Sequence, residues 1–277
     1  MYLRPTNLKE ALGALSSGGM TVLAGGTDFY PARVGKPVTE RILDITALDA
    51  LRGIREEVTY TRIGALTTWS ELIAHPLPDC FAGLKAAARE VGGKQIQNAG
   101  TIAGNLCNAS PAADGIPPLL ALDAEVELAS AVKSRRLPLS EFVLRNRRTA
   151  AAADELLTAI LVPHWGSGAR SNFLKLGSRR YLVISIVMVS AVLESGSDGR
   201  VTRASVSVGA CSEVAQRLPA LEKRLLGQPM SVALADIPVA SDLDSLKPIT
   251  DIRGTDVYRR DAALTLVRRA LRELPGE

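Results

Sequence analysis

The sequence is poor in the side chains that hold metals or carry out acid–base chemistry. It has three cysteines and two histidines among 277 residues, and no Cys-x-x-Cys pair occurs. This excludes the usual ligand sets of zinc sites and iron–sulfur clusters, and argues against a disulfide framework. His75 and His164 each adjoin a proline, so we interpret both as loop residues at the surface. We therefore expect neither a metal site nor a catalytic side chain.

Long hydrophobic runs and strong net charge are also missing. The longest apolar stretch, residues 181–193, is interrupted by Ser185 and Ser190, so we expect no membrane insertion. The N-terminus has no signal-peptide pattern, and a cytoplasmic protein is expected. The net charge of +4 is small, and the basic clusters at residues 145–148 and 259–260 lack interleaved aromatic residues. We therefore expect no nucleic-acid partner.

Common nucleotide and hydrolase signatures are absent as well. The chain contains no GxGxxG, no GxxxxGK[ST] and no GxSxG segment. These absences argue against a nicotinamide-binding fold, a phosphate-transferring ATPase or GTPase, and a serine hydrolase.

Two glycine-rich turns are present instead. The first reads VLAGGTD at residues 22–28, and the second reads GTIAGN at residues 100–105. A glycine lets a ligand approach the main chain, and successive N–H groups in such a turn form a nest for an anion. Two such turns suggest a long ligand with two bridging phosphates, such as a dinucleotide. Combined with few acid–base residues, they favour a protein whose reactive group is a bound cofactor.

The spacing of apolar residues predicts mixed strands and helices in the first part of the chain. Asn7 with Glu10, and Thr68 with Glu71, have the spacing of helix N-caps. A further helix is expected over residues 81–91, with the second glycine turn directly after it. Strands are expected at residues 20–24, 41–45, 58–66, 124–129 and 155–162.

The pattern changes after a linker-like stretch at residues 164–168. Strands followed by helices indicate a separate α+β unit, with a hairpin turn at residues 195–199. We therefore expect a domain at residues 1–165, with subdomains at about 1–55 and 56–165, and a C-terminal domain at residues 170–277. In the latter, strands are expected at residues 172–176, 183–193 and 201–210, and helices at residues 216–226, 232–236 and 256–271.

Both turns resemble the motifs of a known family. AGGTD at residues 24–28 and TIAGNLCNASPAAD at residues 101–114 are similar to the two FAD motifs in the medium subunit of molybdenum hydroxylases, such as xanthine dehydrogenase and carbon monoxide dehydrogenase. The resemblance covers nearly the whole chain. Further similar segments follow in the family's order at residues 64–69, 96–98, 117–123, 173–180, 251–253 and 258–260.

The resemblance implies an α+β fold. It consists of a two-subdomain FAD-binding fold of the PCMH/vanillyl-alcohol-oxidase type, followed by a small C-terminal domain of a three-stranded antiparallel sheet with helices. Two positions depart from the family pattern: Ala103 replaces the first of two consecutive glycines, and Phe29-Tyr30 replaces aliphatic residues. We expect Tyr30 in the core and Cys107 to be a buried packing residue.

The resemblance also implies roles in binding FAD. Main-chain N–H groups of the first turn would hold the diphosphate, with a hydroxyl from Thr27, and the second motif would form the facing wall. Asp114 would accept a hydrogen bond on the adenosine side, Leu161 would lie near the adenine or the flavin ring, and Lys175 would reach the flavin. The candidate cofactor residues are Leu23, Ala24, Gly25, Gly26, Thr27, Asp28, Thr101, Gly104, Asn105, Ser110, Asp114, Leu161 and Lys175.

The implied function is electron transfer within a multi-subunit enzyme. In the family, a large subunit oxidises a substrate at a molybdenum cofactor and a small subunit passes electrons through iron–sulfur clusters. The medium subunit receives them on FAD and passes them to an acceptor such as NAD or oxygen, in a dimer of heterotrimers. A self-sufficient FAD-dependent oxidoreductase and a non-enzymatic nucleotide-binding scaffold remain as alternatives.

Overall fold

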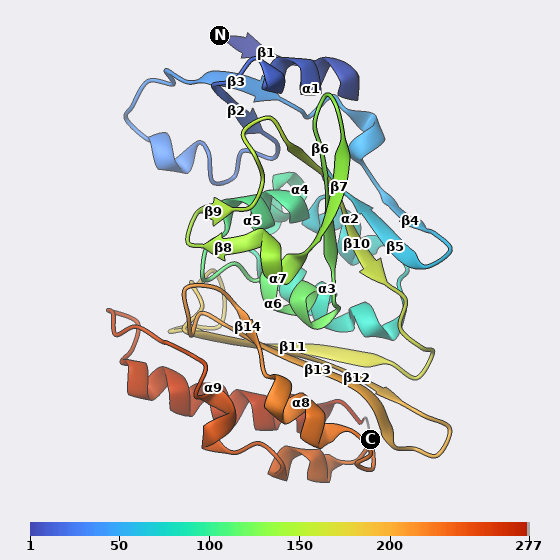
Figure 1. Ribbon diagram of the computed structural model, residues 1–277. Coiled ribbons are helices and arrows are strands. Elements are labelled where there is room, and N and C mark those ends of the chain that lie inside the picture. The colour runs from blue at the N-terminus through green and yellow to red at the C-terminus, as the bar shows by residue number, and fades with distance from the viewer. Residues whose placement is uncertain (276–277) are drawn as a thin grey trace.

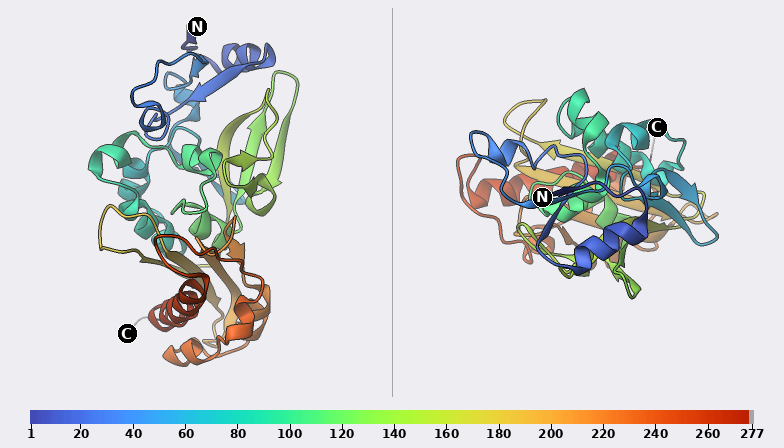
Figure 2. Two further views of the ribbon diagram at one scale, coloured as in Figure 1. Left: turned by 90° about the vertical axis from the view of Figure 1, so that its left-hand side faces the viewer. Right: turned by 90° about the horizontal axis from the view of Figure 1, so that it is seen from above.

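Three units are stacked along the long axis of the molecule. The computed structural model describes residues 1–275. Figure 1 shows a small N-terminal sheet at one end, a central unit of sheet and short helices, and a C-terminal sheet covered by helices at the other end. The side view in Figure 2 shows the same order of units. Within the described residues, no helix combines the length and the apolar character that crossing a membrane requires.

The N-terminal unit is a parallel sheet covered by one helix. Strands β1 (Tyr2–Leu3), β3 (Arg41–Asp44) and β2 (Met20–Leu23) lie in that order. Helix α1 (Leu8–Ser16) begins at the expected cap, where the Asn7 side chain accepts from the Glu10 N–H, and its buried face contributes to the core of this unit. The strands predicted at residues 20–24 and 41–45 are thus confirmed. The first glycine turn starts at the carboxyl end of β2.

The central unit is built on a five-stranded antiparallel sheet in the order β4-β5-β10-β6-β7. Its helices bury Ile63, Trp69 and Leu106 with other residues in one core. The strands are β4 (Ile54–Glu56), β5 (Tyr60–Gly64), β6 (Glu125–Ala129), β7 (Ser134–Pro138) and β10 (Leu156–Pro163), with a separate hairpin of β8 (Val143–Arg145) and β9 (Arg148–Thr149). Two short helices precede this unit: η1 (Pro31–Arg33), between β2 and β3, and η2 (Asp49–Leu51), whose Leu51 packs in the core of the N-terminal unit. The helices of the central unit are α2 (Trp69–Ala74), η3 (Asp79–Phe81), α3 (Ala82–Glu90), α4 (Lys94–Ala99), α5 (Ile102–Asn108), α6 (Ile116–Ala121) and α7 (Leu139–Phe142).

Two sequence predictions for this unit need correction. The second glycine motif does not follow the residue 81–91 helix directly, because α4 lies between them. The motif is also the start of a helix. Thr101 is the N-cap of α5, and its Oγ1 accepts from the Gly104 N–H at 3.0 Å. The Thr-x-x-Gly spacing is therefore a helix N-cap, in which the threonine hydroxyl accepts from a main-chain N–H of the first turn. From the sequence we predicted a glycine turn here and no helix start.

The C-terminal unit has four antiparallel strands, so the prediction of three was one strand short. They are β11 (Arg170–Leu176), β12 (Val187–Ser195), β13 (Val201–Gly209) and β14 (Gln216–Arg217). The short β14 occupies residues predicted as a helix start, and α8 (Pro219–Leu225) begins later because proline suits the first helical position. The remaining helices are η4 (Val232–Asp236), η5 (Ala240–Leu243) and α9 (Asp256–Glu273).

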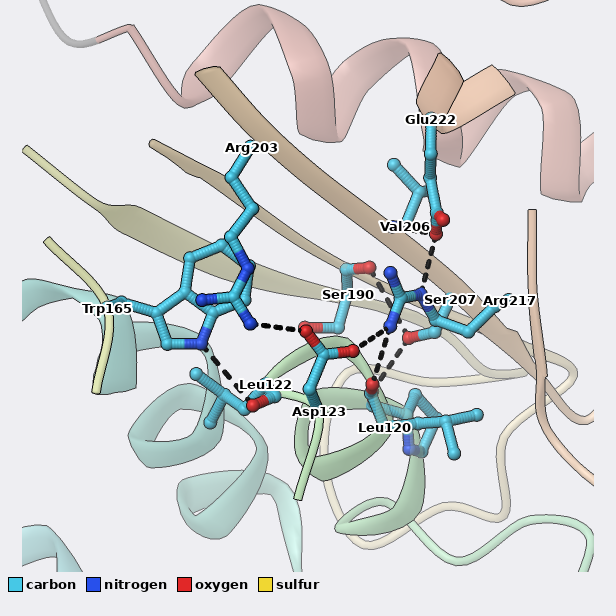
Figure 3. Close-up of polar contacts among 11 residues, drawn as sticks. Leu120, Leu122, Asp123, Trp165, Ser190, Arg203, Val206, Ser207, Arg217 and Glu222 are labelled. Carbon is cyan, nitrogen blue, oxygen red and sulfur yellow. Dashed lines mark hydrogen bonds and ion pairs between the residues drawn. The ribbon is translucent and has the colours of Figure 1, made fainter. Parts of the chain in front are cut away.

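Charged groups join the central and C-terminal units (Figure 3). The Asp123 carboxylate forms ion pairs with Arg203 and Arg217, and Arg217 also pairs with Glu222 at 2.6 Å. The Arg203 guanidinium lies 3.5 Å from the centroid of the Trp165 ring, a cation–π geometry. Helix α6 packs on β12 and β13 beneath this cluster. The two units therefore share one continuous interface.

Candidate cofactor site

The first glycine turn is tightly constrained. A Cβ on Gly25 would lie 1.9 Å from the carbonyl oxygen of Ala99, so only glycine fits there. Gly26 has a φ of +71°, a conformation that L side chains rarely adopt, and a Cβ there would also meet the Tyr30 ring at 2.7 Å. Both glycines are thus required by the packing of the turn itself.

The same contacts bring the two motifs together. Gly25 abuts the end of α4, and a Cβ on Gly100 would lie 3.3 Å from the Thr27 Oγ1. The tertiary structure therefore places the first turn against the segment that leads into Thr101, although they are far apart in the sequence.

A cavity of about 550 Å³ opens beside these turns. This volume lies within the usual range for small-molecule and cofactor sites. The predicted residues that line it are Leu23, Ala24, Gly25, Gly26, Thr27, Asp28, Thr101, Gly104 and Asn105.

The cavity wall carries hydrogen-bond donors without partners. Within residues 1–275, the N–H groups of residues 25–28 donate no hydrogen bond, and neither does the N–H of Ala103. A run of free donors on a glycine turn is what an anionic group requires. The first turn and the start of α5 therefore supply the donors for a phosphate-containing ligand.

The polar groups of the second motif are partly engaged. The Asn105 side-chain oxygen accepts from the Gly115 N–H at 3.2 Å. A Cβ on Gly104 would meet the Thr101 Oγ1 at 2.7 Å, so this glycine also accommodates the helix cap. Within residues 1–275, the Ala103 N–H and the Asn105 side-chain nitrogen of this motif donate no hydrogen bond, and both residues line the cavity.

Four predicted residues lie elsewhere. The cavity lining does not include Ser110, Asp114, Leu161 or Lys175. Leu161 is buried on β10, and the Ser110 hydroxyl accepts from the Ala112 N–H at 3.3 Å.

Asp114 and Lys175 form a buried ion pair. Their charged groups lie 2.8 Å apart, and the other carboxylate oxygen of Asp114 accepts from the Ser185 hydroxyl at 2.8 Å. Burial raises the pKa of the Asp114 carboxyl, while Lys175 and Ser185 oppose that rise. Gly115, the next residue, abuts Trp69, which lines the cavity. The residue next to Asp114 therefore contacts a side chain that lines the cavity, although the pair itself does not line it.

Several lining residues were not anticipated. Trp69, Arg33, Thr149 and Leu157 all line the cavity. Trp69 lay within a family-like segment. On β10 the residue predicted from the sequence was Leu161, whereas the structure places Leu157 at the cavity, and no motif included Arg33 or Thr149.

Two expectations about packing were wrong. Tyr30 is 58% exposed rather than in the core, because its ring covers the Gly26 turn from outside. Cys107 is exposed and lines the cavity, since α5 turns it away from the core face formed by Ile102 and Leu106.

Comparison with known proteins identifies the family. Residues 1–165 match the family model of the FAD binding domain in molybdopterin dehydrogenase, and residues 172–274 match that of the CO dehydrogenase flavoprotein C-terminal domain. The chain belongs to the FAD-binding medium subunits of the molybdenum hydroxylases. As such a medium subunit it binds FAD and is an oxidoreductase component.

Individual relatives cover this medium subunit almost completely. It is 30% identical to the nicotinate dehydrogenase FAD-subunit of Eubacterium barkeri, over 94% of this chain and 91% of that one. It is also 30% identical to the glyceraldehyde dehydrogenase medium chain of Sulfolobus acidocaldarius, over 99% and 97%. Its fold matches the reconstituted CO dehydrogenase from Oligotropha carboxidovorans with a TM-score of 0.89 and 28% identity, over 99% of this chain and 96% of that chain.

Proposed function

We propose that this medium subunit takes electrons from the iron–sulfur clusters of a small subunit onto its FAD and passes them to an external acceptor. The observation that carries the proposal is the cavity beside the two motifs, with free N–H donors along residues 25–28. The match to medium subunits along the whole chain supports the same reading. Bound FAD supplies the redox chemistry, because a flavin ring can accept electrons and release them again.

The diphosphate of FAD would lie on the first turn. The N–H groups of residues 25–28 and the Thr27 hydroxyl would donate to its oxygens, and Gly104 would let it approach the start of α5. Leu23 and Ala24 lead into this turn, while Thr101 and Asn105 shape the facing wall. Gly25 supports this placement, because its missing side chain lets the turn pack against the Ala99 carbonyl oxygen beside the second motif.

The sequence prediction placed Asp114 on the adenosine side and Lys175 at the flavin. Because the two side chains form an ion pair, we propose instead that both act at the flavin end of the site. Each Asp114 carboxylate oxygen accepts one hydrogen bond, which leaves lone pairs that a ligand hydroxyl could share. Asp114 would hold the Lys175 ammonium in position, and that positive charge would favour negative charge on the nearby ring. Ser110 and Leu161 would support the same region from the loop after α5 and from β10.

The division of the chain would follow this arrangement. Residues 1–165 would form the FAD-binding domain, with subdomains at about 1–55 and 56–165 on the two sides of the cavity. Residues 170–277 would form the C-terminal domain, of which residues 276 and 277 lie outside the described part. In the assembled enzyme we propose a dimer of heterotrimers in the cytoplasm, with NAD or oxygen as acceptor.

The test uses the complex co-expressed with its large and small subunits. The complex and the medium subunit alone, each loaded with FAD, are mixed anaerobically with limiting dithionite, and visible absorption is followed over time. We expect the clusters of the complex to be reduced first and the flavin to bleach as they reoxidise, after which NAD or oxygen restores the flavin absorption. Flavin in the complex that stays oxidised beside reduced clusters would refute the proposed route.

The same experiment tests the two alternatives. A self-sufficient oxidoreductase would turn over with NADH and oxygen in the absence of the other subunits. A nucleotide-binding scaffold would lose FAD on desalting, so neither preparation would contain a flavin for the clusters to reduce.

A further inference from the structure

We infer that Arg147 is a cofactor-site residue that joins the Asp28 carboxylate to the diphosphate of FAD. The inference rests on the placement of the diphosphate proposed above. It concerns the basic cluster at residues 145–148, whose presence the proposed electron-transfer role does not explain.

The position of Arg147 connects both cofactor motifs. Its N–H donates to the carbonyl oxygen of Ala109, the C-cap of the helix that begins at the second motif. Its guanidinium Nη1 reaches Asp28 in the first motif at 3.3 Å. In Figure 1 the β8–β9 hairpin that carries it lies beside α5. Arg147 itself does not line the cavity, but it contacts Asp28, which does, and it is fixed to the end of the helix that begins at the second motif.

The conformation of this residue is costly. Arg147 has a φ of +54°, in the left-handed region that glycine, asparagine and aspartate prefer. Its neighbours Arg145 and Arg148 are cross-strand partners in the hairpin, so two like charges face each other. Neither feature favours a stable hairpin. The paired arginines concentrate positive charge on the hairpin whose Thr149 lines the cavity, as an anionic ligand would require.

The ion pair with Asp28 does not account for these costs. The two side chains are 60% and 53% exposed, and exposed pairs contribute little to folding stability. Asp28, however, lines the cavity beside the free N–H groups, where its negative charge would repel a diphosphate. Arg147 neutralises that charge, and within residues 1–275 its Nε and Nη2 donate no hydrogen bond. These donors remain for a phosphate oxygen.

The test measures FAD affinity of the purified chain by quenching of flavin fluorescence at several salt concentrations, together with Tm. In Arg147→Gly we expect FAD to bind about tenfold more weakly at low ionic strength, with a smaller difference at high salt. The Tm should stay the same or rise, because glycine accepts the positive φ without strain. Arg147→Lys should keep part of the affinity, and Arg55→Ala, on the exposed face of β4, controls for the loss of one positive charge.

Variants at Asp28 distinguish a role of Arg147 in FAD binding from a purely structural role in which the ion pair holds the hairpin against the turn. If Arg147 neutralises Asp28 and contacts the phosphate, Asp28→Asn binds FAD as tightly as wild type or more tightly. The double variant Arg147→Gly/Asp28→Asn then loses less affinity than Arg147→Gly alone. If the ion pair only ties the hairpin to the turn, Asp28→Asn weakens binding as much as Arg147→Gly, and the inference is wrong.

Comparing Arg147→Gly with Gly25→Ala distinguishes a failure of the Arg147 role from a failure of the proposed diphosphate placement. An affinity of Arg147→Gly within about twofold of wild type overturns the role of Arg147. If Gly25→Ala still abolishes FAD binding in that case, the placement of the diphosphate stands. If neither change affects FAD binding, both the placement and the role of Arg147 fail.

Discussion

At the scale of single residues, Gly25 is the position where the cofactor site has the least room. An alanine methyl would be placed 1.9 Å from the Ala99 carbonyl oxygen, so the turn or α4 must shift. We predict that Gly25→Ala lowers stability by about 1–3 kcal/mol and loses FAD on desalting. Gly13→Ala is the control, since nothing lies within 4 Å of that position. Retained flavin absorption in Gly25→Ala would contradict the proposed geometry.

The buried pair of Asp114 and Lys175 provides a second prediction at this scale. The side chains are only 10% and 6% exposed, so Lys175→Met leaves a buried carboxylate without its cation. We expect a loss of about 3–5 kcal/mol in unfolding free energy, measured in urea. The double variant Asp114→Asn/Lys175→Met should recover much of this loss, since no buried charge remains. Equal stability of the single and double variants would show that the pair is not coupled.

At the scale of elements, the cap of α5 couples helix formation to the cofactor site. Thr101 holds the Gly104 N–H, and both residues line the cavity. We predict that Thr101→Ala lowers the free energy of unfolding by about 1 kcal/mol and weakens FAD binding. The matched control is Thr255→Ala, which removes the equivalent cap of α9, where the Thr255 side chain accepts from the Tyr258 N–H. It should lower stability similarly and leave FAD affinity unchanged.

The segment before α9 should make stability depend on pH. Hydrogen bonds from Arg253, and then from Arg259, hold the pKa of the Asp251 carboxyl well below its usual range. A lowered folded-state pKa stabilises the fold above the unfolded pKa of about 4, and this stabilisation disappears as pH falls through the folded value. We therefore predict that wild type loses more Tm than Asp251→Asn between neutral pH and about pH 3. Parallel pH profiles of the two proteins would refute this.

At the scale of the whole molecule, Asp123 connects the central and C-terminal units. It has a φ of +55° and accepts from arginines on β13 and β14, as Figure 3 shows. Asn tolerates the same backbone conformation, so Asp123→Asn removes the charge with little strain. We predict that the free energy of unfolding falls by about 1 kcal/mol. The calorimetric transition should also broaden, because the two units unfold less cooperatively. Asp49→Asn, which breaks an exposed ion pair with Arg52 within one turn, should leave the transition sharp.

Local signals explain which elements could be predicted. The capping box of Thr68 and Glu71 and the cap at Asn7 depend on neighbours three residues apart, and both occur as expected. The fourth C-terminal strand could not be predicted in this way. Residues 216 and 217 are a strand only because they pair with Val208 and Ser207 of β13.

The amino-acid sequence by itself determined the family, the FAD cofactor and the two glycine motifs, because each depends on residue types at short spacing. Only the tertiary structure decided which groups meet. Asp114 pairs with Lys175 across 61 positions, and Arg147 reaches Asp28 across 119. Such contacts depend on how all three units pack, since side chains distant in the chain become neighbours only when the cores between them are buried.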